Sequence, residues 1–343
     1  MRKVLLISST FPISKPGGVP TFVEGRAALL SQHDDVRVAA LGRSTRGSEI
    51  SLGSIGKSKW RIFVAWARLI AIVVRLRPHY VEVHNAVVAL PVFIFLRPVY
   101  FFHGPARLEA IAESSSKFRI VLAGLIEKFV VVRSNKILFA SSTFRKLFVG
   151  IYPNKRSESL EVCYPKLVRF DQALVQTAVP SRYFVCVRRL VKRTGIDLAI
   201  GAFAEGCESG RIPADIRLVI AGEGPERVAL EKLAQLTRVG DRIDFVGRVS
   251  NGERNHLYSN AIASLVPTRA LEGFGLVVLE AGYFGCPSVV TDVGALPEVI
   301  QLLGGNGFVT NESEFADAMI KACSFNSDQR DVLQKCVIDR FFV

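Results

Sequence analysis

Short apolar runs alternate with longer helical patterns along the whole chain. In the first half the predicted strands are Val4–Ser8, Val36–Leu41, Val81–His84, Val99–Phe102 and Ile137–Ala140, and the predicted helices are Pro20–Gln32 and Lys117–Arg133. In the second half the predicted strands are Phe184–Arg188, Leu218–Ala221, Ile243–Val246, Ser264–Pro267 and Ser288–Thr291, with helical patterns at 195–205, 225–236, 253–261 and 275–284. Strands separated by helices of this length predict parallel sheets covered by helices on both faces.

The alternation breaks up in one region, where Pro153, Pro165 and Pro180 bracket an irregular stretch. We take this stretch to contain a linker. The prediction is therefore an α/β chain with two doubly wound, Rossmann-like domains, at residues 1–168 and 182–343, joined by a linker at 169–181. Ligands of such sheets bind at the carboxyl ends of the strands, so two of them in tandem predict a cleft between the domains.

Composition adds an asymmetry of charge to this picture. The chain has 343 residues, 49% of them apolar, and a net charge of +13, which excludes a disordered or fibrous protein. Residues 1–175 carry 26 basic and 11 acidic side chains, whereas residues 176–343 carry 18 and 20. The whole positive excess thus lies in the first domain, which suggests an anionic partner for it.

Cysteine usage and hydropathy indicate where the protein works. The six cysteines show no C-x-x-C spacing, which favours reduced thiols in a cytoplasmic protein. No apolar run reaches the roughly 20 residues of a spanning helix. We therefore expect a cytoplasmic chain without a transmembrane segment.

One segment carries the most specific chemistry. Glu272 precedes a Gly273-Phe274-Gly275 turn that opens a helix, and Glu280 lies two turns along that helix. Glycines at a helix start let a ligand approach the backbone, and the amides there suit a phosphate. Two carboxylates at this spacing can accept hydrogen bonds from separate hydroxyl groups of one ligand. For an arbitrary pair of glutamates, solvated surface residues are the simpler interpretation, but the embedded glycines favour a site.

This segment resembles the E-x7-E signature of family 4 of the retaining glycosyltransferases, which have the GT-B architecture of two facing Rossmann-like domains with an interdomain cleft. Other stretches resemble segments of the same family in the same order. They are Phe11-Pro-x4-Gly17-Gly18, Phe101-Phe-His103-Gly104-Pro105, Val187-Arg188-Arg189-Leu190, Ala221-Gly222-Glu-Gly224-Pro225, Phe245-Val-Gly247-Arg248-Val249 and Thr291-Asp292-x-Gly294. No single stretch is decisive, but their order and spacing together are specific.

The resemblance implies roles for individual residues. The implied catalytic residues are His103, Glu272 and Arg189, and the implied donor-binding residues are Gly17, Gly18, Arg189, Arg193, Val249, Glu272, Gly273, Phe274, Gly275 and Glu280. Arg189 would pair with the donor diphosphate, because a guanidinium fork suits two phosphate oxygens. Glu280 would accept from the ribose hydroxyls, and His103 would contact the donor sugar near its anomeric centre.

Thr194 departs from the family at the donor site, since a lysine usually precedes the glycine there. Arg193 or Lys192 would have to supply the second positive charge. Two further departures are the unusual stretch Tyr164–Phe170 and the early end of the chain, where a helix that crosses back to the first domain is expected to be absent or short. Either departure could lower activity.

The implied reaction moves a sugar from a nucleotide-diphosphate sugar to a hydroxyl group, with retention. The departing diphosphate needs charge stabilisation, which Arg189 and the helix amides can supply. No carboxylate nucleophile emerges, which favours front-face attack over a covalent enzyme intermediate. Paired carboxylates also occur in glycosidases, but the basic residues favour a phosphate-bearing donor. No metal is expected, since the chain has no Asp-x-Asp motif and the family generally works without one.

The first domain contains a candidate membrane surface. Arg61, Arg68 and Arg75 recur every seven residues and so share a helical face, next to an aromatic and aliphatic stretch. Lys117–Arg133 is similar. Such helices can lie on an anionic membrane, although helices packed on a sheet with arginine in water have the same pattern. We expect a peripheral protein at the inner face of the cytoplasmic membrane, with a lipid-linked or polysaccharide-precursor acceptor and no nucleic-acid partner.

Three alternatives remain open. The chain could be a membrane-surface protein that binds a nucleotide without catalysis, or a GT-B sugar-nucleotide epimerase that needs no acceptor. A Rossmann oxidoreductase is disfavoured because Ser8-Ser-Thr follows the first strand, in place of G-x-G-x-x-G.

Overall fold

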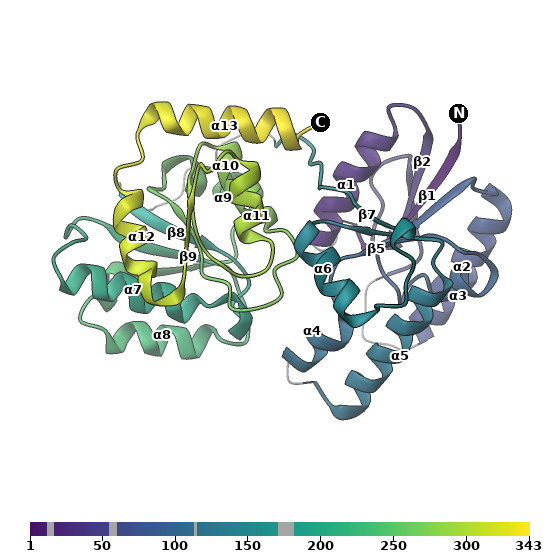
Figure 1. Cartoon of the computed structure of the whole chain (residues 1–343), viewed down its shortest axis with the longest axis horizontal. Helices are drawn as coiled ribbons and strands as arrows, with labels where there is room; N and C mark the ends of the chain where they lie inside the picture. Colours follow the sequence, from purple (N-terminus) through teal and green to yellow (C-terminus); the bar gives the residue numbers. More distant parts are fainter. Residues whose placement is uncertain (12–16, 55–59, 113–114, 171–181) are drawn as a thin grey trace. The chain divides into compact units, whose positions relative to one another are not determined.

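The computed structural model describes residues 1–11, 17–54, 60–112, 115–170 and 182–343. It divides the chain into two compact units, drawn in Figure 1. Unit 1 comprises Met1–Arg169 with Phe341–Val343, and unit 2 comprises Phe170–Arg340. Residues 171–181, most of the predicted linker, lie outside the described part of the chain.

Unit 1 is built on a parallel sheet with strand order β3-β2-β1-β4-β5-β6-β7. The order reverses between β1 and β4, as in Rossmann-like sheets. The strands are β1 (Lys3–Thr10), β2 (Asp35–Leu41), β3 (Glu49–Ser51), β4 (Tyr80–Val83), β5 (Val99–Phe102), β6 (Lys136–Phe139) and β7 (Leu160–Val162). The helices are α1 (Gly18–Leu30), α2 (Trp60–Leu76), α3 (Leu90–Phe95), α4 (Ala106–Ala112), α5 (Lys117–Arg133) and α6 (Ser142–Ile151).

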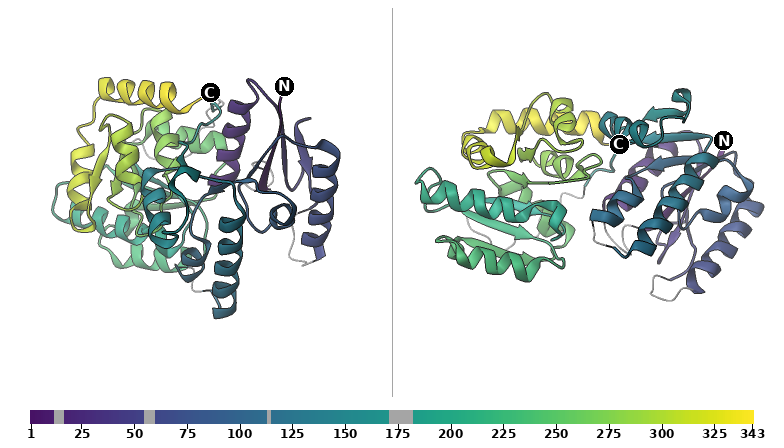
Figure 2. Two further views of the ribbon diagram at one scale, coloured as in Figure 1. Left: turned by 45° about the vertical axis from the view of Figure 1, so that its right-hand side comes forward. Right: turned by 60° about the horizontal axis from the view of Figure 1, so that its bottom comes forward.

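The central strand β1 shows why both faces of this sheet are covered. Val4, Leu5, Leu6 and Ile7 are all fully buried. Val4 and Leu6 belong to one core cluster with residues of α1, and Leu5 and Ile7 belong to another with residues of α2, α3 and α5. Successive side chains of a strand point to opposite faces, so an unbroken apolar run requires helices on both sides, as Figures 1 and 2 show.

Unit 2 repeats this architecture, with strand order β10-β9-β8-β11-β12-β13 and all pairs parallel. The strands are β8 (Tyr183–Val187), β9 (Arg217–Ala221), β10 (Ile243–Gly247), β11 (Ser264–Val266), β12 (Ser288–Thr291) and β13 (Phe308–Thr310). The helices are α7 (Ile196–Glu208), α8 (Arg227–Leu236), α9 (Asn251–Asn260), α10 (Leu276–Tyr283), α11 (Leu296–Leu302), α12 (Phe315–Ala322) and α13 (Ser327–Phe341).

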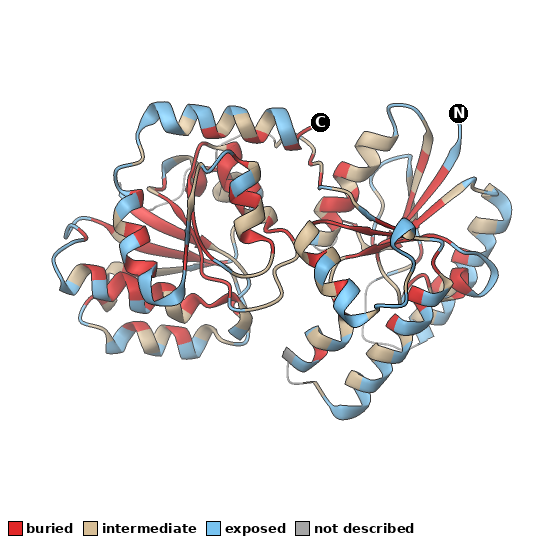
Figure 3. Ribbon diagram, viewed as in Figure 1, coloured by how far each residue is buried: buried red, intermediate tan, exposed pale blue. Residues whose placement is uncertain are grey.

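The core of unit 2 follows the same rule as that of unit 1. Along β8, Phe184 and Cys186 pack into a cluster with residues of α7 and α12, whereas Tyr183 and Val185 pack into a cluster with residues of α9 and α10. Figure 3 shows the buried residues concentrated on the strands and on the inner sides of the helices. The predicted pair of parallel, Rossmann-like sheets is therefore confirmed.

The structure differs from the sequence prediction in detail. Strands β3, β7 and β13 were not predicted, because each has three residues and lies at a sheet edge, which leaves too short an apolar run to stand out. The last three residues were assigned to the second domain, but they group with unit 1. There Leu167 N–H donates to Phe341 O (2.7 Å) and Val343 N–H donates to Leu167 O (2.9 Å). The apolar Phe341–Phe342 pair gave no sign of which sheet it would join.

Candidate functional site

The predicted donor residues of unit 2 lie in loops at the carboxyl ends of β8 and β11. These two strands are neighbours at the point where the strand order reverses. A reversal of this kind opens a crevice at the strand ends, because the loops on either side run to opposite faces of the sheet. The sequence therefore brings its arginine-rich loop after β8 and its glutamate-glycine loop after β11 to the place where doubly wound sheets bind ligands.

Three side chains meet there. Arg188 Nη2 donates to Glu272 Oε2 (2.6 Å), and Arg188 Nη1 donates to the Thr268 hydroxyl. Thr268 in turn donates to Glu272 Oε2 (3.3 Å). The side chains of Arg188 and Glu272 are only 8% and 14% exposed. Both of these bonds to the carboxylate use Oε2.

Close backbone contacts hold the two loops against each other. A Cβ on Gly195 (φ 67°) would lie 1.8 Å from Pro267 O, and one on Gly294 (φ 61°) would lie 2.4 Å from Glu272 O. Only glycine permits both the approach and the left-handed backbone. Leu271, just before Glu272, also has a positive φ of 57°. This conformation costs a non-glycine residue about 1–2 kcal/mol, so strain is concentrated beside the site carboxylate.

The turn after Glu272 leads directly into α10. Gly275 caps the helix in a left-handed conformation (φ 88°), and Phe274 is buried. The first amides of α10 have no carbonyl of a preceding turn to bind. This end of the helix can therefore stabilise negative charge on a ligand.

Glu280 on α10 is a poorly satisfied carboxylate. Its Oε1 lies 3.9 Å from Arg254 Nη1 of α9, and its side chain is 14% exposed. Burial raises the pKa of Glu280, and Arg254 offsets only part of that effect. Among the described residues, the buried Arg254 Nε and Tyr258 hydroxyl also have no hydrogen-bond partner. A group of underused polar atoms of this kind can bind a diol.

The other residues predicted to bind the donor differ in how far they are exposed to solvent. Arg189 is exposed, and Arg193 makes one long bond to Leu271 O (3.4 Å). Thr194 is buried, and its hydroxyl donates to Arg189 O (2.9 Å) and Val191 O (2.7 Å), so it serves the turn and not a ligand. Val249 packs against a core cluster.

His103 of unit 1 lies at the carboxyl end of β5 and contacts a second histidine. His84 Nδ1 and His103 Nε2 are 2.9 Å apart. Burial lowers the pKa of His103 well below its usual value of 6.5, and the neighbouring His84 lowers it further. The Phe101 ring stacks on both histidines, and the Phe22 ring meets them at steep angles. His103 is therefore held as a neutral imidazole.

His84 also contacts a buried carboxylate, that of Glu82. Glu82 Oε1 lies 3.0 Å from His84 Nε2, and both side chains are fully buried. Arg26 donates to both oxygens of Glu82, at 3.0 and 2.9 Å, and the Tyr80 hydroxyl donates to Oε2 (2.7 Å). Burial raises the pKa of Glu82, but His84 and Arg26 outweigh it, so the pKa lies well below its usual value.

Gly17 and Gly18 stand at the start of α1, the helix that carries Phe22 and Arg26. Gly17 is the cap residue and Gly18 the first helical residue. The preceding part of the predicted first loop, residues 12–16, lies outside the described residues.

Comparison with known proteins relates unit 2 to a protein family. Residues 172–335 match the model of the family described as Glycosyl transferases group 1. The matched stretch lies within unit 2 and covers just under half of the chain, so it is unit 2 that is similar to this family. The resemblance inferred from the E-x7-E segment is thereby confirmed.

Curated proteins from distant organisms are similar to part of this chain. The gpi3 subunit of phosphatidylinositol N-acetylglucosaminyltransferase from Schizosaccharomyces pombe is 33% identical over 122 residues, which cover 34% of this chain and 25% of the yeast protein. A GDP-mannose-dependent alpha-(1-6)-phosphatidylinositol monomannoside mannosyltransferase from Mycobacterium tuberculosis is 36% identical over 124 residues, which cover 34% of this chain and 31% of that protein. The matches thus span less than a third of either relative.

A solved structure relates the whole length of the chain to the GT-B fold. HepE from Anabaena, in complex with UDP-glucose, matches with a TM-score of 0.74 and 17% sequence identity, covering 100% of this chain and 96% of that one. The chain therefore has the GT-B fold.

Sequence reasoning missed Arg188, Glu82 and His84. Arg188 replaces a glycine of the family segment, and that replacement was the available signal. Tyr80, Glu82 and His84 alternate along β4, inside a run that is otherwise apolar. Three polar residues on one face of a buried strand were the signal there.

The three arginines predicted to meet a membrane lie on α2 of unit 1. Arg61, Arg68 and Arg75 are exposed, while Ala65 and Leu69 face the core. Exposed apolar side chains cover the rest of the outer surface of α2 and continue over α3 and α5. Helix α2 contacts α3, and α3 contacts α5. We call this surface the apolar face; its residues are Trp60, Phe63, Val64, Ile70, Val74, Ile94, Phe95, Phe118, Val121, Leu122, Leu125, Phe129 and Val132.

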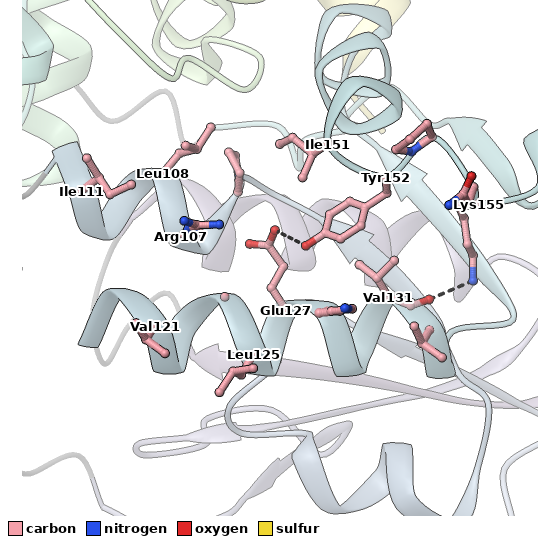
Figure 4. Close-up of a pocket in the computed structure, with 16 residues that line it drawn as sticks. Arg107, Leu108, Ile111, Val121, Leu125, Glu127, Val131, Ile151, Tyr152 and Lys155 are labelled. Atoms are coloured by element: carbon pink, nitrogen blue, oxygen red, sulfur yellow. Dashed lines mark hydrogen bonds between the residues drawn. The ribbon is translucent and has the colours of Figure 1, made fainter. Parts of the chain in front are cut away.

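A groove of about 1040 Å³ runs between α4, α5 and residues 151–155 of unit 1. In its floor the Tyr152 hydroxyl donates to Glu127 Oε1 (2.7 Å), and Lys155 Nζ donates to Val131 O (2.8 Å), as Figure 4 shows. Burial raises the pKa of Glu127. The apolar lining of the groove includes Leu108, Ile111, Val121, Leu125 and Ile151.

Two features are absent from the described residues of the chain. No helix among them is both long and apolar enough to traverse a bilayer. The same residues contain no group of three or more His, Cys, Asp or Glu side chains that could hold a metal ion.

Proposed function

We propose that this chain is a retaining glycosyltransferase that moves a sugar from a nucleotide-diphosphate sugar to a hydroxyl group of a lipid-linked or polysaccharide-precursor acceptor. The observation that carries the proposal is the Arg188–Glu272 pair with α10 and Glu280, assembled at the strand-order reversal of a group 1 glycosyl transferase domain. The relative HepE was solved with UDP-glucose, which supports a nucleotide-sugar donor.

On the donor side, each residue has a role that its surroundings permit. Glu280 accepts hydrogen bonds from the ribose hydroxyls, which would satisfy a carboxylate whose nearest cation is 3.9 Å away. Glu272, fixed by Arg188, accepts from a sugar hydroxyl through Oε1, next to the backbone of Gly273 and Gly275. Val249, near the core of the same unit, is assigned to the donor as well.

The diphosphate is the leaving group, and its developing charge requires positive partners. Arg189 is exposed and pairs with the diphosphate, and Arg193 supplies the second charge that Thr194 does not. The amides at the start of α10 add to this field. Because Glu272 is held by Arg188, we assign no carboxylate as nucleophile. The acceptor hydroxyl attacks from the face that the diphosphate leaves, and its proton passes to the departing phosphate.

His103 contacts the donor sugar near the reacting carbon as a neutral imidazole. Gly17 and Gly18, at the start of α1, let a phosphate-bearing ligand come close to the backbone. These charges and amides act without a metal ion in this proposal.

The acceptor is a lipid at the inner face of the cytoplasmic membrane. The apolar face would enter the boundary of the bilayer, and Arg61, Arg68 and Arg75 beside it would attract anionic headgroups. The groove between α4 and α5 is lined by apolar residues that belong in part to the same face, and it would take hydrocarbon of the acceptor. Two relatives are named for transfer to phosphatidylinositol or its mannosides, which supports a lipid acceptor.

A screen of nucleotide-sugars by thermal shift tests the donor site. The bound donor should raise the melting temperature of the wild type, and Glu280→Ala should abolish that rise because the ribose loses its acceptor. Glu208→Ala, an exposed residue at the end of α7, is the matched control and should keep the full shift. A full shift in Glu280→Ala would contradict the donor-site assignment.

A second candidate is a protein that binds the donor but does not transfer its sugar. Thr194, whose hydroxyl is used by the backbone where the family has a lysine, favours it. Turnover with an acceptor lipid extract separates the two: binding without transfer supports this candidate. Release of free sugar without any acceptor would support an epimerase.

A further inference from the structure

Four polar side chains of unit 1 form a continuous buried chain that ends at His103. Arg26 of α1 contacts Glu82 of β4, Glu82 contacts His84 just after β4, and His84 contacts His103 just after β5. The separations along it are 3.0 Å, 3.0 Å and 2.9 Å. None of the roles proposed above for the reaction uses Arg26, Glu82 or His84.

The first link fixes the charge of Glu82. Oε2 accepts from Arg26 Nη2 and from the Tyr80 hydroxyl, and Oε1 accepts from Arg26 Nε. A fully buried carboxylate with these three donors is ionised, and an ionised carboxylate can only accept hydrogen bonds. His84 Nε2 lies 3.0 Å from Oε1 without the alignment of a hydrogen bond. Two bare acceptor atoms at that distance would repel each other, so we infer that His84 Nε2 carries a hydrogen.

The position of the hydrogen on His84 determines which nitrogen of His103 carries a hydrogen. A neutral imidazole carries its hydrogen on one nitrogen and a lone pair on the other. With the hydrogen on Nε2, His84 presents a bare Nδ1 to His103, and so His103 Nε2 must be the donor of the 2.9 Å bond. The hydrogen of His103 is then used inside the protein, and His103 Nδ1 is left as a hydrogen-bond acceptor.

We propose that Glu82 and His84 are positioning residues that hold His103 in its Nε2–H tautomer, so that Nδ1 accepts a hydrogen bond from a hydroxyl group of the bound sugar. The inference rests on the proposed function for the identity of that ligand. The order of the bonds along the chain does not depend on it. Phe22 and Phe101 cover the imidazole rings and keep water from competing for these bonds.

Among the described residues, the charged and titratable groups next to the two histidines are Glu82 and, through Glu82, Arg26 of α1, Tyr80 at the start of β4 and Cys163 after β7. An extra proton on His84 would give it two N–H groups, and His103 would then have to accept at Nε2 and carry its hydrogen on Nδ1. The proposed tautomer therefore belongs to neutral His84.

Nitrogen-15 NMR of the wild type at pH 8 tests the tautomer directly. The chain has five histidines, and the His103 ring is assigned as the signal lost in His103→Gln. We expect the ring hydrogens to correlate with a protonated Nε2 and a bare Nδ1. A hydrogen on Nδ1 of His103 would overturn the proposal. The measurement needs no substrate, so it stands even if the proposed function fails.

Glu82→Gln gives the second test. The glutamine oxygen should take the Oε2 place, where Arg26 Nη2 and the Tyr80 hydroxyl donate, which leaves its NH2 group facing His84 Nε2 and costs the bond from Arg26 Nε. The two contacts between position 82 and His103 would then reverse their direction, and His103 should carry its hydrogen on Nδ1. His79→Asn is the control. His79 is an exposed histidine just before β4 that takes no part in the contacts from Arg26 to His103, so its loss should leave the tautomer of His103 unchanged.

Activity then separates positioning from mere support of the fold. If the variant reverses the tautomer, kcat/KM for the donor should fall about tenfold, as expected for one hydrogen bond lost. An unchanged tautomer in Glu82→Gln, or a reversed tautomer with unchanged kcat/KM, would overturn the proposal.

Discussion

The two units share a strand order but differ in what they leave unsatisfied. Of the described residues, 20 large apolar side chains are exposed in unit 1 and five in unit 2. The buried carboxylates show the opposite contrast. Glu82 of unit 1 is bonded by Arg26 and Tyr80 at 2.7–3.0 Å, whereas Glu280 of unit 2 has its nearest arginine at 3.9 Å.

This difference indicates how one fold serves two kinds of ligand. Unit 1 closes its polar groups on one another and presents apolar, basic surface, which suits a lipid and its headgroup. Unit 2 covers its apolar surface and leaves polar groups incompletely bonded, which suits a sugar and a nucleotide. A surface left apolar and a carboxylate left half-bonded are both unfavourable for the free protein, so each indicates a partner.

The largest effect is expected from breaking the closed pair of unit 1. Arg26→Met leaves Glu82 as a buried charge without its main partner, and this should lower the free energy of unfolding by about 3–5 kcal/mol. Urea denaturation followed by tryptophan fluorescence measures it, because both tryptophans of the chain, Trp60 and Trp66, lie on α2 of unit 1.

The double variant Arg26→Met with Glu82→Gln is the control for this prediction. It removes both charges, so it should recover most of the lost stability. A loss below about 1 kcal/mol in Arg26→Met would mean that Glu82 is not the satisfied, ionised group described here.

The next effect concerns the surface of unit 1. Replacing Arg61, Arg68 and Arg75 by glutamine should weaken binding to vesicles that contain anionic lipid by about 1 kcal/mol for each arginine, or on the order of a hundredfold together. Vesicle co-sedimentation at low salt measures it. A matched triple variant on exposed arginines at the β2–β3 side of the same unit, Arg2, Arg37 and Arg46, should bind as the wild type does. Equal loss in both triple variants would show only a general effect of net charge.

A smaller effect is expected at the partly open pair of unit 2. Arg188→Ala removes the 2.6 Å bond that orients Glu272, and the affinity for the donor should fall about tenfold, as for one charged hydrogen bond. Calorimetric titration with the donor found by the thermal-shift screen measures it. Arg188→Lys keeps the positive charge but cannot donate to Thr268 and Glu272 at once. Its affinity for the donor should lie between those of the wild type and Arg188→Ala. If Arg188→Ala binds the donor with unchanged affinity, the orientation of Glu272 by Arg188 plays no part in donor binding.

The smallest effect concerns the pH dependence of stability, which should have opposite signs for Glu280 and Glu82. Burial raises the pKa of Glu280, so folding is favoured while it is protonated, and its ionisation costs stability as pH rises above the usual value of 4.5. The pKa of Glu82 is lowered, so its contribution is present above 4.5 and is lost as pH falls. Glu280→Gln should therefore stabilise unit 2 at pH 7 and change nothing well below pH 4.5. Hydrogen exchange of unit 2 amides measures this, and destabilisation at pH 7 would show that Glu280 is well satisfied in the free protein.

Local sequence pattern was sufficient to predict most of the fold. The unbroken run Val4–Ile7 could only be a strand covered on both faces, and the glycines around Phe274 could only be a tight entry to a helix. The three-residue edge strands escaped, because they bury too little apolar surface to differ from loops.

The candidate site was predictable where spacing along one element carries the chemistry, and not where strands bring residues together. Glu272 and Glu280 stand on one turn and helix, so their spacing was sufficient. Arg188 follows a strand beside Arg189, and apart from its standing where the family has glycine, nothing local shows that it turns toward Thr268 in the loop after the neighbouring strand. His84 and His103 are 19 residues apart and meet only because β4 and β5 are adjacent.

The apolar face has a consequence for the free protein in solution. The arginines next to it repel those of other molecules, and this repulsion keeps exposed apolar surfaces apart. Salt screens the repulsion within about 10 Å at 0.1 M but does not weaken apolar contact. Solutions of this chain should thus lose colloidal stability as salt is added, in contrast to proteins that associate through charge, and a mild detergent should restore single molecules where dilution of the salt does not.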